Sequence, residues 1–218
     1  TEPTIHRIRW ADVDGDGKPE LVVAPLHGRG TKAPSWNDGP GSRILVFHVP
    51  KDPSTEPWPV EVAADTLHIV HNFIPVGRDI WVASAEGVYS LHRSTDGKWS
   101  KSLVAEGQPG EIKVGNVGGI RHLATVEPWH GNSVVLYQET PSRPWKRTVI
   151  ETGLNQAHAL GWADFDHDGN DELVVGWRNK PWGMAMFQRS ASGSWVKTPV
   201  DDGVAVEDLT IADLNGDG

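Results

Sequence analysis

The feature that most constrains the fold is a unit of four short β-rich segments, which the chain repeats four times. The last segment of each unit begins with tryptophan and alternates apolar with polar residues: WPVEVA at Trp58, WSKSLV at Trp99, WKRTVI at Trp145 and WVKTPV at Trp195. These segments recur at intervals of 41 to 50 residues. Alternation with a period of two is typical of half-buried β-strands, so each tryptophan is expected to start an outer strand that closes its unit.

Three further β-rich segments precede each of these strands. The second segments are 20–25, 79–84, 122–127 and 172–177, and the third are 43–48, 87–92, 132–138 and 183–188. Gly, Pro, Asn and Asp separate the segments, and no helical period is visible. Four-stranded units of roughly 40–50 residues predict an all-β fold, a β-propeller with four-stranded blades. A β-sandwich is the alternative, but it does not require equal units.

We expect residues 1–218 to form one partial β-propeller. Its blades should cover about 1–64, 65–106, 107–152 and 153–203, with the first strand of a fifth over 204–218. Since the chain lacks an initiating methionine and stops inside a loop, we expect it to be a piece of a longer protein. The sequence does not identify a compartment.

An acidic loop follows the first strand in three of the units. In DVDGDGKPE the residues Asp12, Asp14 and Asp16 alternate ahead of Glu20. The pattern returns in later units as Asp164, Asp166, Asp168 and Glu172, and as Asp213, Asn215 and Asp217. Alternating carboxylates supply the oxygens that Ca²⁺ or Mg²⁺ prefers, so we expect structural cation loops. An EF-hand is excluded because valine stands where its bidentate glutamate would be. The alternative is an ion-free Asp/Gly turn.

A second set of residues lies six positions before each acidic loop, where His6, His158 and Glu207 stand. Matching the remaining units by their strands puts His68 and Glu111 at the same place. Equivalent positions in a ring of blades converge on its axis, and imidazole with carboxylate suits Zn²⁺ or Mn²⁺. We expect His6, His68 and His158 to be metal ligands. The alternative is that each histidine only fills a channel mouth.

The loops between second and third strands should lie on this same face, because the second strand runs back from the acidic loop. Their aromatic and basic residues suit a sugar, and the expected substrate-binding residues are His27, Trp129, Arg178, Trp182 and, through a bend at HNF, His71. The candidates for proton transfer, unresolved among themselves, are Glu207, Glu111, Glu127 and His130.

Charge and hydropathy limit the classes of binding partner that we expect. The formal net charge is −9, so a nucleic acid is an unexpected partner. No apolar run approaches the roughly 20 residues that span a bilayer, so membrane insertion is not expected. A small sugar substrate or a glycan fits this balance better.

Two resemblances add to these patterns. The acidic loops resemble FG-GAP or VCBS repeats. The segments GPGSRILVFHVPKDP, LHIVHNF, ATVEPWHGN, QAHALGWADFDHDGNDELVVGWR and VAVEDLTIADLNGDG resemble the propeller domain of aldos-2-ulose dehydratases, also called pyranosone dehydratases. The second resemblance implies a seven-bladed ring, cupin domains elsewhere in the parent chain, structural divalent ions, Zn²⁺, and dehydration of 1,5-anhydro-fructose or related aldosuloses.

The chemistry so implied is loss of water beside a carbonyl group. This reaction needs a Lewis acid for the developing enolate, a base for the α-proton and an acid for the departing hydroxyl. We therefore expect a metal-assisted lyase, with the activity residing in the intact parent. Two alternatives stay open: a non-enzymatic calcium-binding propeller that binds glycans or a protein partner, and a polysaccharide lyase, which would need a basic groove.

Overall fold

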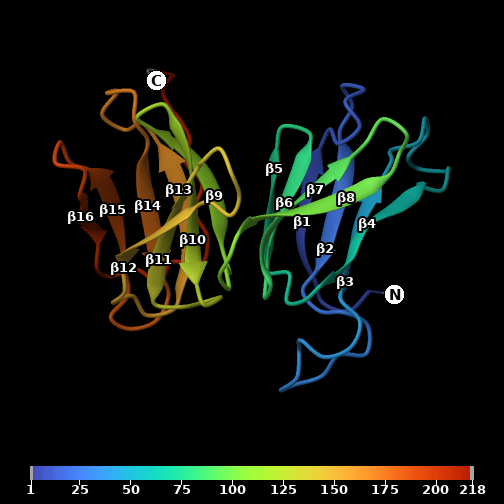
Figure 1. The fold of residues 1–218 in the computed structure, drawn as a ribbon, viewed down its shortest axis with the longest axis horizontal. Coiled ribbons are helices and arrows are strands. Elements are labelled where there is room, and N and C mark those ends of the chain that lie inside the picture. The colour runs from blue at the N-terminus through green and yellow to red at the C-terminus, as the bar shows by residue number, and fades with distance from the viewer. Residues whose placement is uncertain (1, 217–218) are drawn as a thin grey trace. The chain divides into compact units, whose positions relative to one another are not determined.

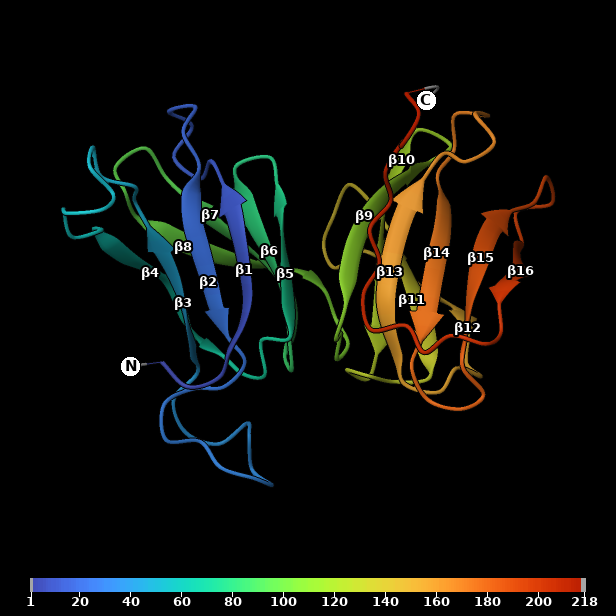
Figure 2. The same cartoon turned by 180° about the vertical axis from the view of Figure 1, so that it is seen from behind.

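The computed structural model describes residues 2–216 and is all-β over that range. It contains sixteen strands in four antiparallel sheets of four, and no helix (Figures 1 and 2). The chain divides into two compact units, Thr1–Pro109 and Gly110–Gly218, here called the N-terminal and the C-terminal unit. In the described part of the chain, no helix is long and apolar enough to cross a membrane.

Each sheet is a simple meander in which consecutive strands pair. In the N-terminal unit the sheets are β1 (Ile5–Ala11), β2 (Glu20–Pro25), β3 (Ser42–Phe47) and β4 (Val60–Leu67), then β5 (Asn72–Val76), β6 (Asp79–Ser84), β7 (Gly87–Arg93) and β8 (Trp99–Ala105). In the C-terminal unit they are β9 (Ile112–Val117), β10 (Ile120–Glu127), β11 (Ser133–Gln138) and β12 (Lys146–Glu151), then β13 (Ala157–Ala163), β14 (Glu172–Trp177), β15 (Gly183–Arg189) and β16 (Trp195–Asp201).

This arrangement confirms the expected four-stranded repeat. The segments predicted at 20–25, 79–84 and 172–177 are β2, β6 and β14 with the same bounds. The first sheet extends further than expected, because β4 continues to Leu67, beyond the boundary near 64. Closure into a seven-bladed ring stays a prediction.

The core of each unit forms between its two sheets. In the N-terminal unit, Val22 and Val46 of the first sheet are fully buried in one cluster with Phe73, Ile80 and Val82 of the second. Because side chains alternate across a strand, one face of each sheet supplies these contacts. The C-terminal unit repeats the arrangement, with β10 and β11 contributing to the same cluster as β14 and β15.

A β-bulge at the start of two first strands sets up the site described below. The β1–β2 register shifts between Ile5 and Arg7, and the β13–β14 register shifts between Ala157 and Ala159. The bulged residue in each case is a histidine, His6 or His158. Bulges redirect a side chain relative to the regular pleat, so both histidines are held out of the ordinary strand alternation.

We expect Phe187→Ala to destabilise the C-terminal unit by about 3–5 kcal/mol, because the ring is 1% exposed and its removal leaves a cavity. Phe165→Ala, in the acidic loop of the same unit, should change stability little, since Phe165 is 45% exposed. Urea denaturation of both variants checks this, and equal losses would contradict the core assigned to this unit.

Candidate functional site

Backbone geometry identifies an equivalent position at the start of successive sheets. His6, His71 and His158 each stand two residues after a residue with positive φ: Thr4 at 50°, Ile69 at 49° and Gln156 at 55°. The backbone N–H groups just before His71, His158 and Glu207 make matching hydrogen bonds, donating to the carbonyl oxygens of Leu26, Gly131 and Trp177. Glu111 immediately precedes β9, as His71 precedes β5.

This register corrects the alignment made from the sequence. His71, not His68, is the counterpart of His6 and His158. The sequence comparison missed it because the positive φ at Ile69 bends the chain just before β5, as it does at Thr4 before β1. An ideal strand without that bend would have placed His71 on the opposite side. Glu207 fits this register through the hydrogen bond of the Val206 N–H, whereas the place of Glu111 in the set stays a prediction.

The bulged histidines make the same contact within each unit. His6 Nδ1 donates to the carbonyl oxygen of His71 at 2.8 Å, and His158 Nδ1 donates to the carbonyl oxygen of Glu207. Each bond joins one first strand to the equivalent position of the next repeat. Because a carbonyl oxygen only accepts, the neutral imidazole carries its hydrogen on Nδ1 and its lone pair on Nε2. Metal-bound histidines commonly have this tautomer, fixed in this way.

His68 has different surroundings. Its Nδ1 lies 2.6 Å from Glu86 Oε1, and its Nε2 lies 3.1 Å from the carbonyl oxygen of Gly39. Both nitrogens therefore face acceptors, an arrangement that suits the imidazolium. Burial lowers the pKa of His68, but the hydrogen bonds to Gly39 and Glu86 outweigh it, so the pKa lies above its ordinary value. These contacts do not favour His68 as a metal ligand.

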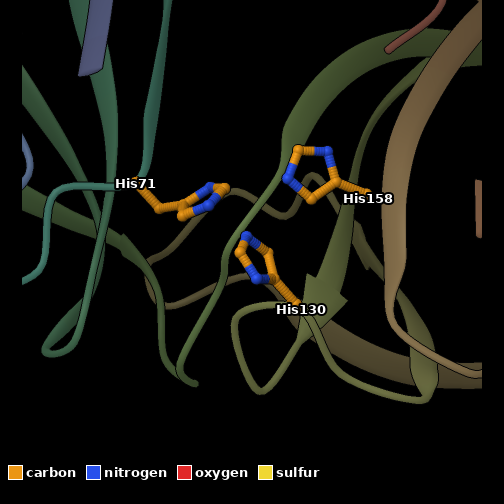
Figure 3. A group of neighbouring side chains, drawn as sticks. All are labelled: His71, His130 and His158. Carbon is orange, nitrogen blue, oxygen red and sulfur yellow. The ribbon is translucent and has the colours of Figure 1, made fainter. Parts of the chain in front are cut away.

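Arg178 connects the expected residues of the C-terminal unit. It follows β14, and its guanidinium donates to Gln156 Oε1 at 3.0 Å, to Glu207 Oε2 at 2.8 Å and to His130 Nδ1 at 2.9 Å. The hydrogen bond from Arg178 lowers the pKa of Glu207. His130 lies in the loop after β10, and its ring centroid is 4.5 Å from that of His158 (Figure 3).

Glu127 lies in a separate buried network. It is 5% exposed and accepts hydrogen bonds from Thr125 Oγ1, from the Tyr137 hydroxyl and from Arg147. Burial and the neighbouring carboxylate raise the pKa of Tyr137 above its ordinary value. A carboxylate with three donors inside the sheet has a clear structural role, so the geometry does not favour Glu127 for proton transfer.

The remaining expected substrate-binding residues are distributed among loops. His27 stacks on Trp36 with ring centroids 4.0 Å apart, and burial lowers its pKa. Trp182 lies under the Lys180 ammonium, 4.6 Å from the ring centroid. Trp129 has a φ of 49° in the loop that carries His130. All three are partly buried, and their binding roles stay predictions.

Two acidic loops have closely similar internal hydrogen bonds. Asp12 accepts from the backbone N–H groups of Gly15 and Gly17, and Asp164 accepts from those of Asp168 and Gly169. At the end of each loop the glutamate that begins the second strand turns back. Glu20 Oε2 accepts from Val13 N at 3.0 Å, and Glu172 Oε2 accepts from Phe165 N at 2.8 Å.

The carboxylates of both loops are grouped closely enough to hold a cation. Ligand atoms lie within 4.8 Å of one another in three sets: Asp12, Asp14 and Asp16; Asp14, Glu20 and His48; Asp164, Asp166 and Glu172. Burial raises the pKa of Glu20 and of Glu172, and the neighbouring aspartates add to this. A bound cation would relieve that repulsion. That the loops bind a cation, and which cation they bind, stay predictions.

The third acidic loop is described only in part. Asp213 accepts from the backbone N–H groups of Asn215 and Gly216 at 3.2 and 2.7 Å. Asp217, which was also expected to be a ligand, lies outside the described residues.

Two residues beside these loops were missed in the sequence. His48 Nδ1 lies 3.6 Å from Glu20, while Gln188 Nε2 donates to Asp166 at 2.6 Å. They are structurally equivalent, since each follows a phenylalanine paired with the residue after the loop glutamate, Phe47 with Leu21 and Phe187 with Leu173. Aligning the third strands on these phenylalanines would have revealed both positions.

Comparison with known proteins gives one relation. No protein-family model matches the chain. The chain is 28% identical over 211 residues to a protein named aldos-2-ulose dehydratase from Phanerodontia chrysosporium. The match covers 79% of this chain and 23% of that relative, so the chain spans less than a quarter of the relative's length. This supports a distant relation to a dehydratase, whereas the likeness to FG-GAP or VCBS repeats stays a prediction.

We expect Ca²⁺ to raise the melting temperature of the chain by binding the acidic loops, with a stabilisation of about 2.7 kcal/mol at 100 times Kd for one site. The double variant Glu20→Gln, Glu172→Gln should lose most of this rise, because each glutamate is a buried carboxylate of its loop. Differential scanning calorimetry measures it. Glu139→Gln, on an exposed carboxylate outside the loops, is the control. An undiminished rise in the double variant would exclude these carboxylates as ligands.

We expect Glu86→Gln to lower the pKa of His68. Because the folded-state pKa lies above the ordinary 6.5, the contacts of His68 stabilise the fold below pH 6.5, and this contribution is lost as the pH rises through the raised value. Titration of the His68 ring protons by NMR gives both pKa values. A pKa that does not move would show that Glu86 is not the partner that holds the proton.

Proposed function

We propose that the chain is part of a carbohydrate-active lyase, which removes water from an aldos-2-ulose such as 1,5-anhydro-fructose with the help of a divalent metal ion. The distant relation to a protein named aldos-2-ulose dehydratase supports the reaction class. In this proposal the four sheets are four blades of a seven-bladed β-propeller, and the acidic loops are structural Ca²⁺ or Mg²⁺ sites of the FG-GAP or VCBS type.

The observation that carries the metal assignment is the repeated Nδ1 contact. His6 and His158 donate from Nδ1 to a backbone carbonyl oxygen, which places the lone pair on Nε2 in each case. This donor chemistry fits Zn²⁺ or Mn²⁺, for which neutral imidazole is a common ligand. We therefore assign His6 and His158 to metal binding. In this proposal His71 takes the place of His68, because it stands two residues after a residue with positive φ, as His6 and His158 do.

The metal would supply Lewis-acid polarisation of the sugar carbonyl. The chain's own residues would orient the sugar and move protons. Arg178 holds Glu207 as a carboxylate through a 2.8 Å hydrogen bond, so Glu207 is better suited to accept a proton than to donate one. Glu111 is buried at the equivalent position before β9 and is the second candidate base. Glu127 is left out, because Arg147 and Tyr137 already hold it.

The partly buried tryptophans near Arg178 suit the carbon face of a sugar ring. Trp177 and Trp182 lie on either side of the short loop that contains Arg178, and both keep part of their surface exposed. Aromatic faces offer apolar surface to the C–H side of a sugar, while neighbouring polar groups meet its hydroxyls. This supports a sugar as the ligand.

The decisive experiment is ultraviolet absorbance of 1,5-anhydro-fructose incubated with the chain and with any longer natural form of it. A rising enone band that a chelator abolishes and Zn²⁺ restores is the expected result. No band from a longer form that still binds Ca²⁺ would overturn the proposal and favour a propeller that binds glycans without turning them over.

We expect His158→Ala to lower both the Zn²⁺ content and the rate of enone formation, by at least tenfold for turnover, because it removes a ligand nitrogen. His92→Ala is the matched control, since His92 lies on β7 with half of its side chain exposed. Metal analysis by mass spectrometry and the absorbance assay measure the two effects. Unchanged metal content and turnover in His158→Ala would remove this residue from the site.

A further inference from the structure

Arg178 makes more directed contacts than a surface arginine needs. Its side chain is partly buried, and its guanidinium meets three different acceptors, on Gln156, Glu207 and His130. Its backbone N–H also donates to the carbonyl oxygen of Gln156 at 3.1 Å. These bonds hold the guanidinium plane in one orientation, and they direct one of its N–H groups at the His130 ring.

The bond between Arg178 and His130 fixes which nitrogen of His130 carries hydrogen. A guanidinium only donates and does not lose its proton in proteins. His130 Nδ1 must therefore accept, at 2.9 Å, with its lone pair directed at Arg178. The neutral ring then has its hydrogen on Nε2. In this tautomer His130 is a hydrogen-bond donor through Nε2 and is not a metal ligand through that nitrogen.

The neighbouring ring of His158 carries its hydrogen and its lone pair on the opposite nitrogens to those of His130. Its Nδ1 donates to the carbonyl oxygen of Glu207, so its lone pair is on Nε2. The two ring centroids are 4.5 Å apart, with 44° between the ring planes (Figure 3). Glu207 helps to fix both tautomers, because its carboxylate accepts a hydrogen bond from Arg178 and its carbonyl oxygen accepts one from His158. Of these two adjacent imidazoles, His130 therefore has a hydrogen on Nε2 and His158 has a lone pair on Nε2.

We propose that Arg178 is a positioning residue that fixes His130 as the donor to the carbonyl oxygen of an α-hydroxycarbonyl compound. His130 Nε2–H bonds the carbonyl oxygen, while His158 keeps its Nε2 lone pair for the metal ion. A polyol of the same length has a hydroxyl in place of the carbonyl. The hydroxyl oxygen also accepts, but its hydrogen needs an acceptor of its own, so we expect the polyol to be the weaker ligand. This deepens the proposed function, on which its choice of substrate class rests, by separating the role of His130 from that of the metal ligands.

The tautomer itself is the first test and needs neither metal nor turnover. Two-dimensional ¹H–¹⁵N spectra of the chelator-treated chain distinguish a bare ring nitrogen from a protonated one. The expected result for His130 is a bare Nδ1 with hydrogen on Nε2, near neutral pH. Hydrogen on Nδ1, or a doubly protonated ring, would overturn the proposal without any variant being made.

Variants then test the part played by Arg178. In Arg178→Gln the amide can either donate a hydrogen bond to the ring or accept one from it, so His130 should become a mixture of tautomers. Arg178→Lys keeps a donor that does not accept, and the tautomer should persist. Arg189→Gln, on an exposed arginine of the same unit, is the matched control. A His130 tautomer that is unchanged in folded Arg178→Gln would exclude the positioning role. If that variant does not fold, the lysine variant decides, because loss of the tautomer there excludes the role equally.

Ligand discrimination is the final test. Dihydroxyacetone and glycerol differ only in the carbonyl group, so they form a matched pair of probes. The His130 ring signals should shift at a lower concentration of dihydroxyacetone than of glycerol, and binding of dihydroxyacetone should weaken at least tenfold in Arg178→Gln. Equal shifts with both probes would refute the assigned ligand class. The expected shifts with dihydroxyacetone, together with no enone from 1,5-anhydro-fructose, would refute the proposed dehydratase activity but not the donor role of His130.

Discussion

The close approach of β13 to β9 on one side and to the segment around Leu209, after β16, on the other is the constraint on which the C-terminal unit depends. A Cβ atom at Gly115 would lie 2.5 Å from the Trp162 ring, and one at Gly161 would lie 2.5 Å from Leu209. The chain packs this closely because glycine leaves room for the neighbour's large side chain. That approach also brings the carbonyl oxygen of Glu207 within reach of His158. The hydrogen bond that sets the His158 tautomer is therefore a consequence of backbone packing.

The architecture could be predicted from the sequence because its signal is repetitive. Period-two alternation and the repeated tryptophans identified the strands, and the acidic loops could be aligned by their spacing. The candidate site was harder to predict. His71 was assigned to the wrong position because the positive φ at Ile69 leaves no mark in the sequence. The partners of Glu127 could not be foreseen either, since Arg147 lies on β12, two strands away in the sheet, and the sequence does not give the register of these strands.

Arg178 shows why residue type alone did not resolve the chemistry of the C-terminal unit. In the sequence it was a plausible contact for a sugar, equal in weight to Trp182 or Trp129. Its three acceptors give it a different role, because a permanently charged donor determines the hydrogen positions of the groups around it. His130 and His158 are the same residue type and lie side by side, yet their environments make them complementary. Separating two similar groups in this way is how proteins divide acid and base roles.

The glutamate at the end of each acidic loop also fixes the register in which the first two strands of its sheet pair. Glu20 pairs with Ala11 and Glu172 pairs with Ala163, at the edge of the first two strands. A slip of one residue in this pairing would turn the carboxylate to the other face of the sheet and away from the loop. The backbone N–H of Val13 or Phe165 would then lose its acceptor. The loop therefore fixes the register of the first two strands of its sheet. The third and fourth strands and the loops between them can then vary in length without disturbing the histidine at the opposite end of the first strand.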